Sequence, residues 1–241
     1  MRLASFLFCN DIQERCCIFM HVYLVRHGQS YVNLPDWNDY DWDKPLTELG
    51  ELQAAAVANW LKDNIKAGLL YSSTLVRTHQ TAEYISKATG LEILFDHRIR
   101  EIGTNAPDGS PLESSEETRY IEGVWGTQLP YDPVTGNGEN WMQFRSRIGT
   151  FIESLIRMFD NHSPSTEEER IAQSIIVVCH GGVIEAFFEY VFEKGPWSVV
   201  SVMTHNTGIT YFEYRPTTNR PEWRLHYHNR IEHLSADLLT R

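Results

Sequence analysis

The sequence contains few cysteines and no long hydrophobic run. The uninterrupted apolar stretches are far shorter than a membrane-spanning helix requires. The cysteines show neither zinc-site spacing nor the pairs of a disulfide framework; they are Cys9, Cys16, Cys17 and Cys179. These absences predict a protein of a reducing compartment, of which the cytoplasm is the simplest, without a membrane partner.

Positive charge is also scarce. The chain has 21 Lys and Arg residues against 32 Asp and Glu residues, which gives a formal net charge of -11 at pH 7. Nucleic-acid phosphates and acidic lipid surfaces repel such a protein, so no nucleic-acid partner is expected. Any anion-binding site must therefore gather its cations locally. The sequence leaves the oligomeric state open.

The length and the apolar content are sufficient for one large hydrophobic core. With 241 residues and 42% hydrophobic residues, a single α/β domain over residues 20–241 is the expectation. Residues 1–19 precede the first predicted strand and differ from the rest of the chain in composition. We interpret them as an N-terminal extension or as the product of an upstream start codon.

Two apolar runs each end in a histidine followed by glycine. Residues 21–25 lead into Arg26, His27 and Gly28, and residues 174–179 lead into His180. Both runs read as buried strands, and ligands bind at the carboxyl ends of strands in open α/β sheets. Glycine lets the backbone turn sharply and approach a ligand closely. The two histidines are therefore predicted to meet in one crevice.

A third segment, residues 71–82, reads as a short strand, a Ser/Thr cap and the opening of a helix. Arg77 lies in the first turn of that helix, where a cation is unfavourable with the helix dipole. An anion beside Arg77 would compensate, and guanidinium groups are well suited to phosphate oxygens. The pattern predicts an anion site that contains Arg26 and Arg77 as well as the two histidines.

Together these segments resemble the histidine phosphatase superfamily, also called phosphoglycerate mutase-like, over roughly residues 20 to 214. The resemblance consists of Arg-His-Gly at the first strand, the Ser-Ser-x-x-x-Arg-Thr-x-Gln-Thr-Ala segment, a glutamate in the middle and the late His-Gly-Gly. It implies a three-layer αβα sandwich with a mixed, mostly parallel central sheet. No metal or cofactor is implied.

The resemblance also implies roles for individual residues. His27 would be the nucleophile that accepts the phosphoryl group, while Arg26, Arg77 and His180 would bind its oxygens. Glu101 would protonate the leaving alcohol and later accept a proton from water. Asp108 and Glu139 remain alternative proton donors. Further substrate-binding positions are implied at Ser30, Asn33 and Gly181.

Residues 103–140 form a long stretch rich in Gly, Pro and acidic residues, and we expect a lid insertion over the site. Its acidic and aromatic side chains are predicted to select a monoester whose alcohol is neutral or cationic and offers a flat or apolar face. The aromatic residues concerned are Tyr120, Trp125 and Tyr131, with Trp37 and Trp42 opposite.

The predicted activity is metal-independent hydrolysis of a small phosphorylated metabolite through a phosphohistidine. A mutase must hold two phosphates, whereas Arg119 is the one basic residue among eight acidic ones from Glu101 to Glu139. Mutase-type phosphoryl transfer and non-catalytic phosphate binding remain alternatives. A cysteine phosphatase is excluded, because the residue separated from Cys179 by five others is Glu185 instead of arginine.

Overall fold

A computed structural model describes residues 19–122, 129–160, 166, 173–192, 201–216 and 222–240. In this part of the chain six strands form one sheet in the order β3-β2-β4-β1-β5-β6. The strands are β1 (Met20–Arg26), β2 (Leu69–Ser72), β3 (Ile93–Phe95), β4 (Ser174–Cys179), β5 (Ile209–Arg215) and β6 (Glu222–Arg230).

The sheet is mixed and mostly parallel, as predicted. Strand β4 pairs in parallel with both β1 and β2, and β2 pairs in parallel with β3. Strand β5 runs antiparallel to β1 and to β6. The central position of β1 and β4 explains why residues 22–25 and 175–179 are apolar, since both faces of each strand are covered.

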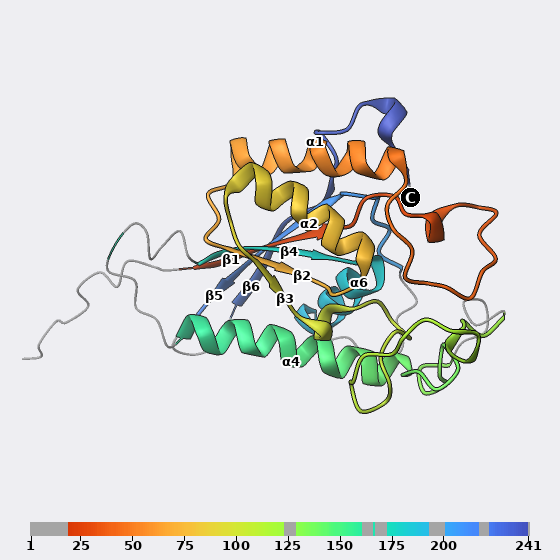
Figure 1. Cartoon of the computed structure of the whole chain (residues 1–241). Helices are drawn as coiled ribbons and strands as arrows, with labels where there is room; N and C mark the ends of the chain where they lie inside the picture. Colours follow the sequence, from red (N-terminus) through yellow and green to blue (C-terminus); the bar gives the residue numbers. More distant parts are fainter. Residues whose placement is uncertain are drawn as a thin grey trace, which may run out of the picture.

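Helices cover both faces of the sheet (Figure 1). Helices α1 (Glu48–Asn64) and α2 (Val76–Thr89) lie on one face, and α4 (Trp141–Asp160) and α6 (Gly181–Val191) lie on the other. Each face has its own apolar core: Leu61 and Ile85 belong to the first, Phe144 and Phe187 to the second. The three-layer αβα sandwich is therefore confirmed.

Local sequence signals set the ends of these helices. The Thr47 side chain caps α1 by accepting a hydrogen bond from the Gly50 N–H at 3.0 Å. Helix α2 ends at Gly90, whose φ of 79° is left-handed and suits glycine. Burial of the apolar faces against the sheet then holds the helices in place.

Residues 103–140 connect the short 3₁₀ helix η2 (His97–Ile99) to α4. The described part of this segment contains the 3₁₀ helix η3 (Glu116–Thr118) and a few isolated bridges in place of a further sheet. In Figure 1 this segment and the loop after β1 lie at the end of the sheet where β1, β2 and β4 terminate. Residues 1–18 and Trp125, to which two predictions refer, lie outside the described residues.

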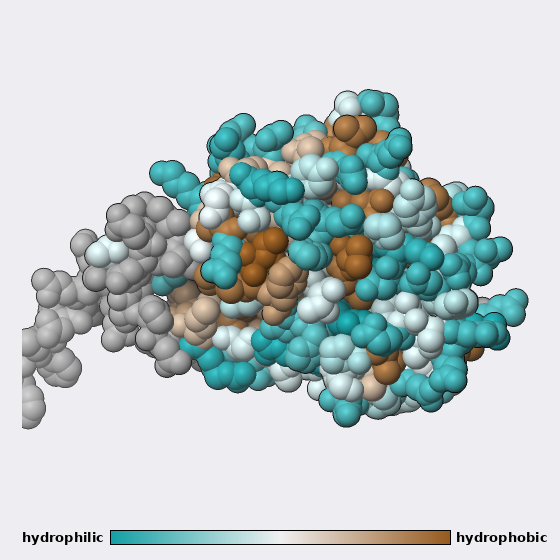
Figure 2. Space-filling view, in the orientation of Figure 1, coloured by the Kyte–Doolittle hydropathy of each residue, from teal (hydrophilic) through white to brown (hydrophobic). Residues whose placement is uncertain are grey.

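Figure 2 shows a mainly hydrophilic face with small hydrophobic patches, one of them where β3 forms the edge of the sheet. Phe95 of β3 is exposed. No helix among the described residues has the length and apolarity needed to cross a bilayer.

Candidate active site

His27 lies directly after β1 and is buried. Its Nδ1 is 2.7 Å from the Gly28 carbonyl oxygen, and its Nε2 is 3.2 Å from Arg77 Nε. Because a carbonyl only accepts and a guanidinium only donates, Nδ1 carries the ring proton and Nε2 carries the lone pair. The backbone of Gly28 thus selects the tautomer in which Nε2 is nucleophilic.

The charge state of His27 follows from its surroundings. Burial, followed by the nearby positive charges of Arg77 and Arg26, holds the pKa of His27 well below its usual value of 6.5. Both effects disfavour the imidazolium. His27 is consequently neutral at physiological pH, which is the form that can attack an electrophile.

The two arginines reach the histidine from different elements. Arg77, in the first turn of α2, is buried and also donates to the Trp42 carbonyl oxygen at 2.8 Å. Arg26, the last residue of β1, donates to the Thr204 carbonyl oxygen, while its Nε is buried without a hydrogen-bond partner among the described residues. These positive groups are held in place before any ligand binds.

His180 follows β4 and is the N-cap of α6. Its Nε2 is 2.9 Å from Ser73 Oγ, and its ring centroid is 5.1 Å from that of His27. Burial and then the charge of Arg77 hold the pKa of His180 well below 6.5. Its Nδ1 is buried and makes no hydrogen bond to the described residues. The structure thus brings together the four predicted residues Arg26, His27, Arg77 and His180.

A cavity of about 310 Å³ opens in front of His27. Arg26 and Arg77 line it beside His27, and Glu101 and Glu185 also line it. The remaining wall is largely aromatic and apolar, with one amide and one glycine: Val32, Asn33, Trp37, Trp42, Ile102, Tyr120, Trp141 and Gly182. The cavity therefore combines a cationic part with a wall of aromatic rings and carboxylates.

Glu101 is held by backbone N–H groups. It accepts hydrogen bonds from Ile102 at 2.9 Å and from Gly182 at 3.3 Å. A Cβ atom at position 182 would lie only 2.3 Å from Glu101 Oε1, so glycine is required there for this close approach. The second glycine after His180 thus lets α6 contact the predicted proton donor.

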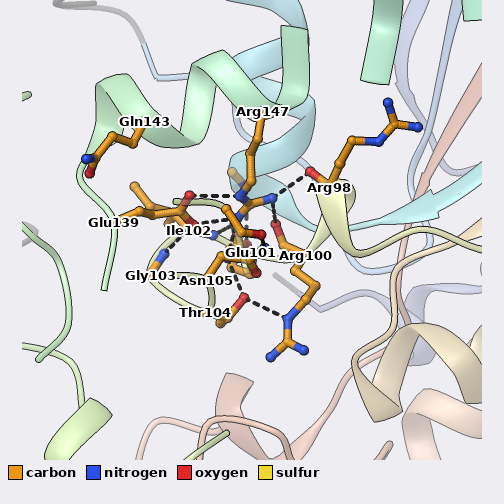
Figure 3. A network of polar contacts seen from close by, with 12 residues as sticks. Arg98, Arg100, Glu101, Ile102, Gly103, Thr104, Asn105, Glu139, Gln143 and Arg147 are labelled. Atoms are coloured by element: carbon orange, nitrogen blue, oxygen red, sulfur yellow. Dashed lines mark hydrogen bonds and ion pairs between the residues drawn. The ribbon is translucent and has the colours of Figure 1, made fainter. Parts of the chain in front are cut away.

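A buried ion pair clamps the segment that carries Glu101 (Figure 3). Arg147 of α4 bonds both carboxylate oxygens of Glu139, at 2.8 and 2.5 Å. The same guanidinium donates to the carbonyl oxygens of Arg98, Arg100 and Glu101, at 2.6, 2.9 and 3.0 Å. Arg147 therefore fixes the backbone of Glu101 from behind the cavity.

The alternative proton donors lie elsewhere. Glu139 is only 1% exposed, is paired with Arg147 and accepts the Gly103 N–H at 3.2 Å. Asp108 is bonded to Ser110 at the surface. Neither carboxylate lines the cavity that contains His27, whereas Glu101 does.

The predicted substrate-binding positions differ in their surroundings. Asn33 lines the cavity, while Ser30 is fully buried and donates to Asn33 Oδ1 at 3.1 Å. A Cβ atom at Gly181 would lie 3.9 Å from Arg26 Nε, but Gly182 and not Gly181 lines the cavity. Of the predicted aromatic residues, Tyr131 is 65% exposed and away from the cavity, whereas the three that line it are Trp37, Trp42 and Tyr120.

Several residues of the site were not predicted. Glu185 and Trp141 line the cavity, Ser73 contacts His180, and Asn206 Nδ2 donates to the His27 carbonyl oxygen at 3.1 Å. Glu185 follows Gly182 by three residues, which is helical spacing, so this position could have been inferred from the sequence. Asn206 carries no such signal, because it reaches the site from a distant loop.

The described residues contain no group of three or more His, Cys, Asp or Glu side chains placed to hold a metal ion. The polar groups of the cavity are instead donors for an anion, together with two carboxylates. This combination suits the binding and protonation of a phosphate ester.

Comparison with solved structures shows the same fold. Native mycobacterial glucosyl-3-phosphoglycerate phosphatase matches with a TM-score of 0.66 and 23% identity, covering 88% of this chain and 99% of that one. Phosphoserine phosphatase from Entamoeba histolytica, in complex with 3-phosphoglyceric acid, matches with a TM-score of 0.64 and 24% identity, covering 89% and 99%.

Comparison by sequence points in the same direction. A probable phosphoglycerate mutase GpmB of Shigella boydii is 28% identical over 224 residues, covering 91% of this chain and 97% of the relative. A model of the histidine phosphatase superfamily (branch 1) matches residues 22–228, which include His27, Arg77, Glu101 and His180. The chain belongs to the histidine phosphatase superfamily.

Proposed function

We propose that this protein hydrolyses small phosphomonoesters through a phosphohistidine at His27. The observation that carries the proposal is the state of His27: its ring is neutral, Nε2 holds the lone pair, and Arg77 Nε lies 3.2 Å from that atom. A nucleophile held beside a cation favours attack on phosphorus, because the charge that develops on the phosphoryl oxygens is stabilised.

In the first step the Nε2–P bond forms and the ester P–O bond breaks. Glu101 gives a proton to the leaving alcohol oxygen, so the alcohol departs neutral. Arg26, Arg77 and His180 donate to the phosphoryl oxygens. Arg26 Nε and His180 Nδ1, which are buried without partners among the described residues, would gain acceptors in this way.

In the second step water replaces the alcohol. Glu101, now ionised, takes a proton from the water as it attacks phosphorus. The P–N bond breaks, inorganic phosphate leaves, and His27 returns to its neutral tautomer. The reaction needs no metal or cofactor, because the arginines supply the positive charge.

Mutase-type transfer is the second candidate, since curated relatives are named probable phosphoglycerate mutases. A bisphosphate intermediate requires cations at two places. Among the described residues that line the cavity, the cationic side chains are Arg26 and Arg77, and both lie at His27. The acidic side chains of the lining are Glu101 and Glu185. A second phosphate would meet carboxylates, which favours hydrolysis.

The test is hydrolysis of an aryl phosphate by the purified chain in excess chelator. We expect turnover by the wild type and by His79→Ala, an exposed histidine of α2, and none by His27→Ala. Rapid quenching should trap an acid-labile phosphoenzyme in the wild type but not in His27→Ala. Undiminished turnover by His27→Ala would refute the nucleophile.

Glu101→Gln separates an enzyme from a phosphate-binding protein. Hydrolysis of an alkyl phosphate should fall by about 10²–10⁴-fold, the usual contribution of a general acid. Affinity for inorganic phosphate should change little, since Glu101 is not among the proposed donors. If the wild type shows no turnover, and the wild type and Glu101→Gln bind phosphate equally well, a non-catalytic phosphate-binding protein would be favoured.

A further inference from the structure

Glu185 is a cavity carboxylate for which the proposed mechanism has no use. It lies on α6 one turn beyond Gly182, and it lines the same cavity as His27. Within the described residues it makes no hydrogen bond or ion pair. Its neighbour one turn further along, Glu189, is bonded by Arg145 at 2.7 Å and by Trp141 Nε1 at 3.1 Å. The charge of Glu189 is therefore compensated, whereas that of Glu185 is not.

An uncompensated carboxylate in this place is unfavourable for the folded protein. Burial first, and then the negative charges of Glu189 and Glu101, raises the pKa of Glu185 to about 7. A ligand with positive charge near Glu185 would stabilise the ionised carboxylate and so oppose this shift. The folded chain thus retains a group whose surroundings favour a cationic ligand.

The aromatic residues of the cavity fit the same kind of ligand. Trp37, Trp42, Tyr120 and Trp141 line it. The faces of Trp and Tyr rings attract cations, most of all weakly hydrated quaternary ammonium groups. Carboxylates beside aromatic rings are therefore suited to an alkylammonium group.

We propose that Glu185 is the specificity-determining residue of the cavity and binds an ammonium group on the alcohol part of the substrate. The substrate class is then phosphomonoesters of small amino alcohols, including quaternary ones. In this arrangement the phosphoryl group lies against His27 and the arginines while the cationic end reaches Glu185, and about 310 Å³ accommodates a molecule of this size. This inference rests on the proposed hydrolase function.

The test compares phosphocholine with 3,3-dimethylbutyl phosphate, in which carbon replaces the charged nitrogen at nearly the same shape. We expect the wild type to favour phosphocholine in kcat/KM by about tenfold or more, as a partly buried ion pair allows. Glu185→Gln should lose most of this ratio. Glu153→Gln, an exposed glutamate of α4, is the matched control and should keep it.

The pH dependence of the ratio is a second readout. The ratio should rise as the pH rises through about 7, because Glu185 becomes ionised there. The other charged groups near it are Glu101, Glu189 with its partner Arg145, and the arginines of the same cavity, Arg26 and Arg77. In Glu185→Gln the ratio should be independent of pH in this range.

Binding of the two esters to His27→Ala, measured by calorimetry, gives the same comparison without turnover. Equal kcat/KM values of the wild type for the two esters, together with equal affinities of His27→Ala for them, would overturn the role of Glu185. An undiminished preference in Glu185→Gln would do the same. Aryl phosphate hydrolysis that depends on His27 would still support the proposed function in either case, whereas its absence would refute that function separately.

Discussion

The ion pair between Arg147 and Glu139 offers the sharpest test of how the fold positions the site. Arg147→Met removes a guanidinium that is 7% exposed and leaves the Glu139 carboxylate, 1% exposed, without its partner. Breaking a buried pair in this way costs about 3–5 kcal/mol, because one charge remains buried and uncompensated. We expect the free energy of unfolding to fall by about that amount in urea titrations followed by circular dichroism.

Catalysis should also suffer, and in a particular pattern. The carbonyl oxygens of Arg98, Arg100 and Glu101 lose their donor in Arg147→Met, so the proton donor is no longer fixed. The kcat for an alkyl phosphate should fall by about 10²-fold, since small displacements of a catalytic group have effects of this size. An aryl phosphate, whose leaving group needs little protonation, should be affected much less.

The double variant Arg147→Met/Glu139→Gln separates stability from positioning. Removing both charges avoids the uncompensated carboxylate, so a large part of the lost stability should return. The kcat for the alkyl ester should stay low, because the donors to the Glu101 segment are still missing. Met and Gln keep much of the side-chain volume of the residues they replace.

The pH dependence of the stability lost in Arg147→Met gives an internal check, because the buried Glu139 carboxylate causes that loss. Burial already raises the pKa of Glu139 above its usual 4.5, and loss of Arg147 raises it further. As the pH falls, Glu139 of folded Arg147→Met binds a proton at a pH where the unfolded chain is still ionised. The loss of unfolding free energy relative to the wild type should therefore shrink as the pH falls toward 4.5. A deficit below about 1 kcal/mol at pH 8, or equal losses for alkyl and aryl esters, would refute the reasoning.

Two further changes test the cavity itself. Gly182→Ala places a Cβ 2.3 Å from Glu101 Oε1, so alkyl phosphate turnover should fall by about 10²-fold with little loss of stability. The control is Gly149→Ala, where the Cβ meets only ordinary contacts of 3.5 Å or more, and this variant should keep full activity. Glu185→Gln should raise the free energy of unfolding above pH 7 by about 1–2 kcal/mol, allowing for partial exposure, because it removes an unfavourable buried charge. That gain should vanish toward pH 4.5, and a variant less stable than the wild type at pH 8 would contradict it.

The sequence by itself determined the two central strands and the cationic part of the site. Strands β1 and β4 have apolar interiors and are followed directly by His27 and His180, and the carboxyl ends of adjacent parallel strands meet at one edge. Arg77 could be placed because a cation in the first turn of a helix implies an anion beside it. These features depend on local patterns and on a general rule of topology.

Tertiary structure alone decided how the carboxylates are paired. Glu139 is bonded by Arg147 in the clamp behind the cavity, whereas Glu185 in the cavity wall has no such partner among the described residues, although both are acidic residues near glycines in the sequence. Their roles depend on which side chains approach from α4 and from the segment after η2, and such approaches are set by packing between distant parts of the chain. Burial and neighbouring charge then fix what each carboxylate can do, and neither quantity is written in the local sequence.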